Sequence, residues 1–146
     1  MIQLVLDTSV VLKWIRQEEI LAEQALDILH GYLEGHIRVI VPTLLIYEVA
    51  NVLRYKVEFT TMHLETAIQS LFNLDLEWVV ASSEIARRSV NLARVYDTSV
   101  YDAVFAAVAE GAGATLVTAD VRLVQRLERL SYVVFLGEIA NHLQLS

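Results

Sequence analysis

The sequence predicts an α/β fold with a central parallel β-sheet and helices on both of its faces. Short apolar runs rich in Val, Ile and Leu alternate with longer stretches in which apolar residues recur at helical spacing. A strand without polar alternation is typical of a parallel sheet, because both of its faces are buried. Alternating strands and helices are then joined by right-handed crossovers, which place helices on both sides of the sheet.

Five apolar runs are predicted to be the strands of this sheet. The first lies in the stretch Ile2 to Val10 (IQLVLDTSV), and its apolar part ends at Asp7. The second, Ile37 to Val41, is closed by Pro42. The other three are Glu77 to Val80, Thr115 to Thr118 and Tyr132 to Phe135.

Eight segments show helical periodicity or follow capping residues. Thr43, Thr60 or Thr61, and Ser82 or Ser83 are suitable N-caps for three of them. The predicted helices are Val10 to Ile15, Glu18 to Gly35, Leu44 to about Val57, Met62 to about Leu74, Glu84 to about Tyr96, Val100 to Glu110, Val121 to Leu130, and Gly137 to Leu143.

Length and composition exclude several classes of protein. The chain of 146 residues supports one domain, residues 1–146, and no apolar run is long enough to span a membrane. A basic, cleavable leader is missing, so we expect a cytoplasmic protein. Cys is absent, which excludes disulfides and thiolate sites. The hydrophobic content of 55% fits a compact core with a surplus for an oligomer interface.

The formal net charge of −7 argues against broad affinity for nucleic acids, because Lys and Arg supply that affinity. This objection weakens if several acids are buried ligands of a metal cation, since the cation would neutralise them. The local placement of Arg would then matter more than the net charge.

Two aspartates follow predicted strands in the same way. Asp7 ends the first strand and Asp120 follows the fourth, and each has a hydroxyl residue two positions away, Ser9 and Thr118. The carboxyl ends of parallel strands lie at one edge of the sheet, where open α/β proteins bind ligands. The alternative for each Asp is a cap on the helix that follows it.

Two further acids border apolar helix faces. Glu48 lies in LLIYEVANVLR on or beside the buried stripe, where a lone carboxylate is costly unless it is paired, protonated or bound to metal. Its alternative is an ion pair with Arg54 or a place at the rim. Asp102 lies in the first turn of its predicted helix, where Ser99 and Asp102 can instead imitate a capping box.

Four carboxylates at one sheet edge would form a site made entirely of oxygen ligands, which suits Mg²⁺ or Mn²⁺. Without a cation they could not all stay ionised in a small cleft. Such a cluster suits hydrolysis of phosphodiesters by a water molecule that the metal activates. We therefore predict that Asp7, Glu48, Asp102 and Asp120 are both metal ligands and catalytic residues.

The motifs around these acids resemble those of one protein family. They are LVLDTSV with Asp7, YEVANVLR with Glu48, SVYDAVFAAVAE with Asp102 and LVTADVRL with Asp120, and together they extend from Ile2 to Leu123. The sequence resembles PIN-domain ribonucleases, and most closely the VapC-type toxins of prokaryotic toxin–antitoxin pairs.

The resemblance implies a PIN-like three-layer α/β/α sandwich and a Mg²⁺- or Mn²⁺-dependent endoribonuclease that cleaves structured RNA such as tRNA or rRNA. It also implies a homodimer and a cognate VapB-type antitoxin that blocks the cleft. By the family pattern the four acids form a quartet that Ser9 and Thr118 support. Asp97 is a further acid near the cleft, with a loop residue or helix cap as its alternative role.

Basic residues lie near the acids along the sequence. Lys13 and Arg16 follow the first strand, and Arg122 and Arg126 lie in the helix after Asp120. We predict that these four contact RNA phosphates around the cleft. Solvated helix faces are the alternative for each of them.

Other functions stay open as alternatives. One is a non-catalytic PIN-like module that binds RNA or protein, although such modules usually lack one of the acids. Another is a PIN nuclease of RNA processing or of flapped DNA. A receiver domain would need a late-strand Lys, and no Lys lies beyond position 56. A haloacid dehalogenase-like phosphatase would need an acid where Ser9 stands.

Overall fold

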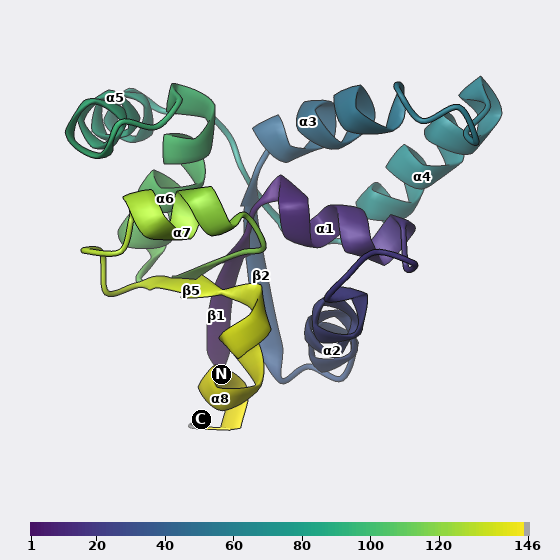
Figure 1. The fold of residues 1–146 in the computed structure, drawn as a ribbon, viewed down its shortest axis with the longest axis horizontal. Helices are drawn as coiled ribbons and strands as arrows, with labels where there is room; N and C mark the ends of the chain where they lie inside the picture. Colours follow the sequence, from purple (N-terminus) through teal and green to yellow (C-terminus); the bar gives the residue numbers. More distant parts are fainter. Residues whose placement is uncertain (145–146) are drawn as a thin grey trace.

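The computed structural model describes residues 1–144, in which five parallel strands form one sheet (Figure 1). The central strand β1 (Ile2–Leu6) pairs with β2 on one side and with β4 on the other. The other strands are β2 (Ile37–Pro42), β3 (Glu77–Val79), β4 (Thr115–Thr118) and β5 (Val133–Phe135), and the order across the sheet is β3-β2-β1-β4-β5.

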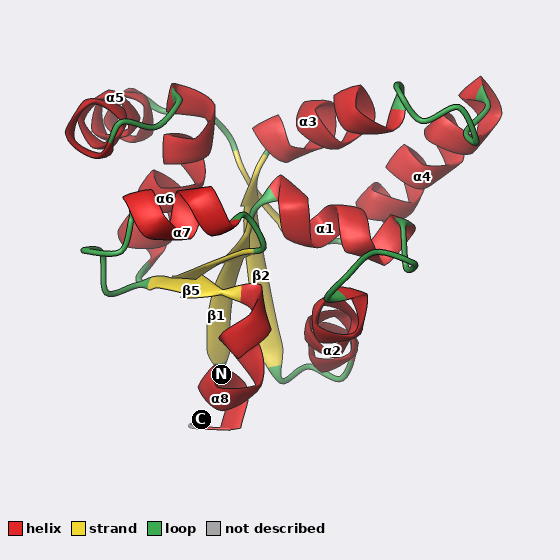
Figure 2. Cartoon of the chain, viewed as in Figure 1, coloured by secondary structure: helices red, strands yellow, loops and turns green. Residues whose placement is uncertain are grey.

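Helices cover both faces of this sheet (Figure 2). α5 and α6 pack together, and α6 lies against β1, β2 and β4, whereas α1 and α2 lie on the opposite face (Figure 1). The predicted α/β/α sandwich is thereby confirmed. The helices are α1 (Thr8–Ile15), α2 (Ala22–Leu33), α3 (Leu44–Leu53), α4 (Thr61–Asn73), α5 (Ser83–Tyr96), α6 (Val100–Ala112), α7 (Val121–Arg126), the 3₁₀ helix η1 (Leu136–Glu138) and α8 (Ile139–Gln144).

All five predicted strands occur, but several helix ends differ from the prediction. The second helix begins at Ala22 rather than Glu18, because Leu21 adopts a left-handed conformation with φ of 68°. The third ends at Leu53 rather than near Val57, whose side chain is fully exposed and offers no apolar contact to extend the helix. The helix α6 ends at Ala112, two residues beyond the predicted end at Glu110. The helix α7 ends at Arg126, four residues before the predicted end at Leu130.

Side chains cap some helices as predicted and fail to cap others. The Thr60 hydroxyl accepts a hydrogen bond from the His63 N–H, and the His63 ring accepts one from the Thr60 N–H. Ser82 accepts from the Ile85 N–H. Thr43 stands at the N-cap position of α3, as predicted, but its side chain makes no capping hydrogen bond.

The core fixes the position of the carboxyl edge of β1. Leu4, Val5 and Leu6 have no exposed surface, because helices pack on both faces of the sheet and α6 and α1 both contact this strand. Each such side chain contributes about 1.5–3 kcal/mol by its burial. Asp7, the next residue, is therefore attached to the buried central strand of the sheet. Within residues 1–144, no helix is both long enough and apolar enough to cross a membrane.

Candidate functional site

A polar cleft of about 310 Å³ opens at the carboxyl edge of the sheet. Asp7 at the end of β1, Glu48 on α3, Asp102 on α6 and Asp120 at the start of α7 all line it. The structure therefore brings the four acids chosen from the sequence into one place, which we call the acid cleft. Its other lining residues are Thr8, Ser9, Leu12, Asn51, Val52 and Phe105.

Asp7 is held by two hydroxyl groups, one from the first turn of α1 and one from the last residue of β4. Ser9 Oγ donates to Asp7 Oδ1 at 2.5 Å, and Thr118 Oγ1 donates to Oδ2 at 2.5 Å. Both hydroxyls are oriented by the chain after β4, because the Ala119 N–H donates to Ser9 and the Asp120 N–H donates to Thr118. Asp7 stands at the N-cap position of α1, where its side chain makes no full capping hydrogen bond, although the backbone N–H of Val10 in the first turn helps to lower its pKa.

Glu48 is half-buried and is also held by a hydroxyl. Thr8 Oγ1, in the first residue of α1, donates to Glu48 Oε1 at 2.6 Å across 40 positions of sequence. Arg54, the alternative partner, instead lies over the ring of Tyr55 with its Cζ 4.4 Å from the centroid. The carboxylate of Glu48 therefore faces the acid cleft without a cationic partner among residues 1–144.

The other two acids lie at helix N-termini. The Asp102 N–H donates to Ser99 Oγ at 3.0 Å, so Ser99 caps α6 and the side chain of Asp102 is left to line the cleft. Asp120 does cap its helix, because its Oδ1 accepts from the N–H groups of Arg122 and Leu123 at 3.0 and 3.4 Å. The cap uses only one of its two carboxylate oxygens.

The electrostatics of the cleft favour a bound proton or a cation. Burial raises the pKa of Asp7 to about 6, although the hydroxyl hydrogen bonds offset part of the rise. Burial also raises the pKa of Glu48 and that of Asp102. Repulsion adds to each shift, since the charge of Asp102 acts on Asp7 and Glu48, and the charge of Asp120 acts on Asp102.

The donor set fits a hard divalent cation such as Mg²⁺ or Mn²⁺. All four acids offer carboxylate oxygens, the ligands that these ions prefer, and their mutual repulsion would be relieved by a positive charge. Within residues 1–144, no three Asp, Glu, His or Cys groups already surround a single point closely enough to enclose an ion. The carboxylates therefore line the cleft without forming a closed coordination shell.

Lys13 and Arg16 do not line the acid cleft. Lys13 Nζ pairs with Glu19 at 3.1 Å, and only 12% of its side chain is exposed. Arg16 pairs with Glu19 at 2.9 Å and with Glu18 and Glu58 at 3.1 Å each. Both cations are thus engaged by acids that the sequence alone did not connect with them.

Arg122 and Arg126 lie closer to the acids. They line a second polar hollow of about 210 Å³ that shares Asp102 and Asp120 with the acid cleft. Attraction to Arg126 partly offsets the raised pKa of Asp102, which places the guanidinium within electrostatic range of that carboxylate.

Asp97 contacts Arg126, a residue of this second hollow. It ends α5 in a left-handed conformation, and Arg126 donates to its backbone carbonyl oxygen. Its side chain is fully exposed and lines neither polar hollow. It does not cap α6, which is the role of Ser99.

Two polar residues of the cleft were not predicted as site residues from the sequence. Thr8 belongs to the same motif as Asp7. The feature that could have indicated its place in the cleft is a hydroxyl residue directly after an acid that ends a strand. Asn51 follows Glu48 by three positions, one helical turn, and lines the cleft with it.

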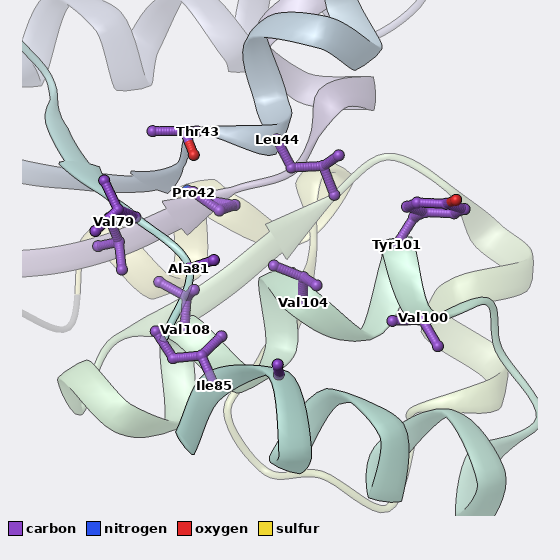
Figure 3. A pocket seen from close by; sticks show the side chains of 12 residues that line it. Pro42, Thr43, Leu44, Val79, Ala81, Ile85, Val100, Tyr101, Val104 and Val108 are labelled. Atoms are coloured by element: carbon purple, nitrogen blue, oxygen red, sulfur yellow. The ribbon is translucent and has the colours of Figure 1, made fainter. Parts of the chain in front are cut away.

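An apolar hollow of about 230 Å³ lies on another side of α3 and α6 (Figure 3). Leu44, Val79, Ile85, Tyr101 and Val104 are among the side chains around it. Two of the lining residues are largely exposed to solvent, since Tyr101 is 63% exposed and Val80 is 69% exposed. The complete lining consists of Pro42, Thr43, Leu44, Val79, Val80, Ala81, Ile85, Ala86, Val100, Tyr101, Val104 and Val108.

Comparisons with known proteins identify the family of the chain. The family model described as PIN domain matches residues 4–130, which include all four acids of the cleft. No curated protein sequence matches the chain.

Several solved structures share the fold. PAE2754 from Pyrobaculum aerophilum is 19% identical with a TM-score of 0.66, and the match covers 99% of this chain and 97% of that one. A toxin–antitoxin complex from Klebsiella pneumoniae is 20% identical with a TM-score of 0.66, covering 89% and 94%. VapBC-1 from nontypeable Haemophilus influenzae is 17% identical with a TM-score of 0.66, covering 93% and 99%. At these identities the likeness shows the fold alone.

Proposed function

The chain belongs to the PIN domain family, and from this premise we propose that it is a Mg²⁺- or Mn²⁺-dependent endoribonuclease, the toxin of a VapBC-type pair. The observation that supports this proposal most strongly is the acid cleft. Its four carboxylates come from four separate places along the chain, and none of the cations in residues 1–144 forms an ion pair with Glu48.

Each acid has a distinct role in this proposal. Asp7 is the fixed ligand, because hydroxyl groups hold both of its oxygens in a buried position. Asp102 lies among the other three acids and interacts electrostatically with each of them. Glu48 and Asp120 close the site from α3 and α7.

A divalent cation bound here would supply positive charge for the scissile phosphate and acidity for the attacking water. The chain itself holds the acids, excludes bulk solvent from Asp7 and presents Arg122 and Arg126 beside Asp102 and Asp120. These guanidinium groups would hold phosphates of the RNA backbone, which reduces the repulsion between an anionic substrate and a chain of net charge −7.

The proposed partners are a VapB-type antitoxin and a second copy of the chain. The fold is shared with chains of toxin–antitoxin complexes, which supports an antitoxin as the inhibitor of the cleft. For the homodimer we propose the apolar hollow as the contact surface. In a two-fold dimer one patch must be complementary to itself, and here an apolar depression lies beside protruding Val80 and Tyr101.

Cleavage of total RNA by the purified protein, freed of any antitoxin, tests the proposed activity. We expect discrete fragments with Mg²⁺ or Mn²⁺ and none with EDTA. Asp7→Asn should lower the cleavage rate by about a thousandfold, because loss of metal-mediated charge stabilisation costs several kcal/mol.

Asp27→Asn is the matched control, since Asp27 is exposed on α2 away from the cleft. It should cleave like the wild type, and circular dichroism should show that both variants are folded. Metal-independent cleavage, or full activity of Asp7→Asn, would refute the proposed site.

A further inference from the structure

The acid cleft contains many hydrogen-bond acceptors and few side-chain donors. Its four carboxylates can only accept hydrogen bonds when ionised. The apolar lining residues Leu12, Val52 and Phe105 offer neither donors nor acceptors in their side chains. An RNA phosphodiester has non-bridging oxygens that also only accept, so its binding here requires donors besides a cation.

The two hydroxyl donors that line the cleft are already used within the protein. The Thr8 hydroxyl donates its proton to Glu48 at 2.6 Å, and the Ser9 hydroxyl donates its proton to Asp7 at 2.5 Å. Because a hydroxyl has a single proton, neither group can donate to a substrate without releasing a carboxylate.

Asn51 is the remaining side chain of the lining with N–H donors. Within residues 1–144, its amide forms no hydrogen bond to another protein group, and the residue is exposed on the same side of α3 as Glu48. Its two N–H donors are therefore available at the wall of the cleft that α3 provides.

We infer that Asn51 is a substrate-binding residue that donates a hydrogen bond to a non-bridging oxygen of an RNA phosphodiester in the acid cleft. The inference rests on the proposed endoribonuclease function. It differs from the role of Arg122 and Arg126, because a neutral amide contributes a directed hydrogen bond without adding charge. The amide therefore orients the phosphate, whereas the guanidinium groups attract it.

This difference gives the inference a measurable signature. Removing a cation that contacts a phosphate reduces the dependence of RNA affinity on salt concentration, whereas removing a neutral donor does not. Asn51→Ala should weaken binding on the order of tenfold, the effect of one hydrogen bond to a charged acceptor. The slope of log affinity against log salt should stay unchanged. Arg126→Gln should lower that slope by about one.

The experiment measures RNA binding by fluorescence anisotropy at several salt concentrations with Mg²⁺ present. It uses the Asp7→Asn background, in which we expect RNA to be cut about a thousandfold more slowly. Asn51→Ala is compared with Arg126→Gln and with Asn91→Ala, a matched control on α5 whose amide donates to its own helix at the Arg87 carbonyl. Ala is a better helix former than Asn, so the exposed position on α3 should tolerate the change.

Steady-state cleavage and metal calorimetry complete the test in protein with an intact Asp7. Asn51→Ala should raise KM about tenfold and leave the affinity for Mn²⁺ unchanged. Equal RNA binding by Asn51→Ala and the control would overturn the inference while leaving the nuclease proposal intact. A loss of Mn²⁺ affinity parallel to the loss of RNA affinity would also overturn it, because Asn51 would then act through the metal. If the parent protein neither binds nor cleaves RNA, both proposals fail together.

Discussion

The acid cleft and the apolar hollow use the same two helices for opposite purposes. α6 contributes Asp102 to the cleft and its neighbour Tyr101 to the hollow, and α3 contributes Glu48 to the cleft and Leu44 to the hollow. The cleft holds charges that need neutralisation, whereas the hollow exposes apolar surface that needs covering. One helix can therefore serve a chemical site on one side and an assembly surface on another, with consecutive residues divided between them.

The largest effect that we expect concerns the acid cleft. It is the change in the free energy of unfolding with pH, and it comes from the buried carboxyl of Asp7. Because burial raises its pKa to about 6, above the ordinary value of 3.8, the folded state holds this proton more tightly than the unfolded chain. The resulting stability is present below about pH 4 and is lost as the pH rises through 6. In EDTA, Asp7 should therefore reduce the free energy of unfolding by about 3 kcal/mol between these limits.

Urea denaturation from pH 4 to pH 7 measures this effect. Asp7→Asn should remove most of the decline with pH, and added Mg²⁺ should oppose the decline in the wild type because the cation stabilises the ionised form. If the free energy of unfolding changed with pH in the same way in the wild type and in Asp7→Asn, ionisation of Asp7 would not be what destabilises the metal-free protein.

The hollow should respond to charge in a different way. Val80→Lys would place an ammonium group at the rim of the apolar hollow, and covering it in the proposed dimer would cost several kcal/mol. We expect the dimer dissociation constant to rise on the order of a hundredfold. Light scattering and sedimentation at micromolar concentration measure the change.

Val90→Lys is the matched control for the hollow, because Val90 is an exposed residue of α5 outside the lining. It should leave the dimer intact. A monomeric wild type, or equal dimerisation of both variants, would mean that the hollow is not the contact surface.

The smallest expected effect concerns Thr8, whose hydroxyl keeps Glu48 in place. Thr8→Val preserves the shape of the side chain but removes the hydrogen bond to Glu48 Oε1. Affinity for Mn²⁺, measured by calorimetry, should fall about tenfold, as is usual when a group that orients a metal ligand is lost. Thr8→Ser should restore it. Identical affinities in the three proteins would show that Glu48 needs no support from α1.

The sequence predicts the cleft better than the hollow for a physical reason. A carboxylate in an apolar helix, as at Glu48, is energetically unusual and therefore visible in a single sequence. Asp7 and Asp120 were visible because each follows an apolar strand. By contrast, Leu44, Val104 and Val108 look like any other core residues, and only the folded arrangement of their elements leaves a space between them.

Long-range partners explain most of what the sequence did not predict. Arg16 is engaged in part by Glu58, 42 positions away, so its position after Asp7 in the sequence did not indicate its contacts. The hydrogen bond from Thr8 to Glu48 joins α1 to α3 and has no local pattern. The start of α2 depends on the left-handed backbone conformation of Leu21, and the residue type Leu does not predict such a conformation.

The pairing of β1 with β4 also has a consequence for synthesis on the ribosome. Asp7 is among the first residues made, but Thr118, which donates to its Oδ2, lies 111 positions later. β4 can join the sheet only after it has left the exit tunnel, and Asp120 follows it directly. Throughout most of translation the nascent chain therefore carries the first acids without the last one, so the complete cleft appears only late in translation.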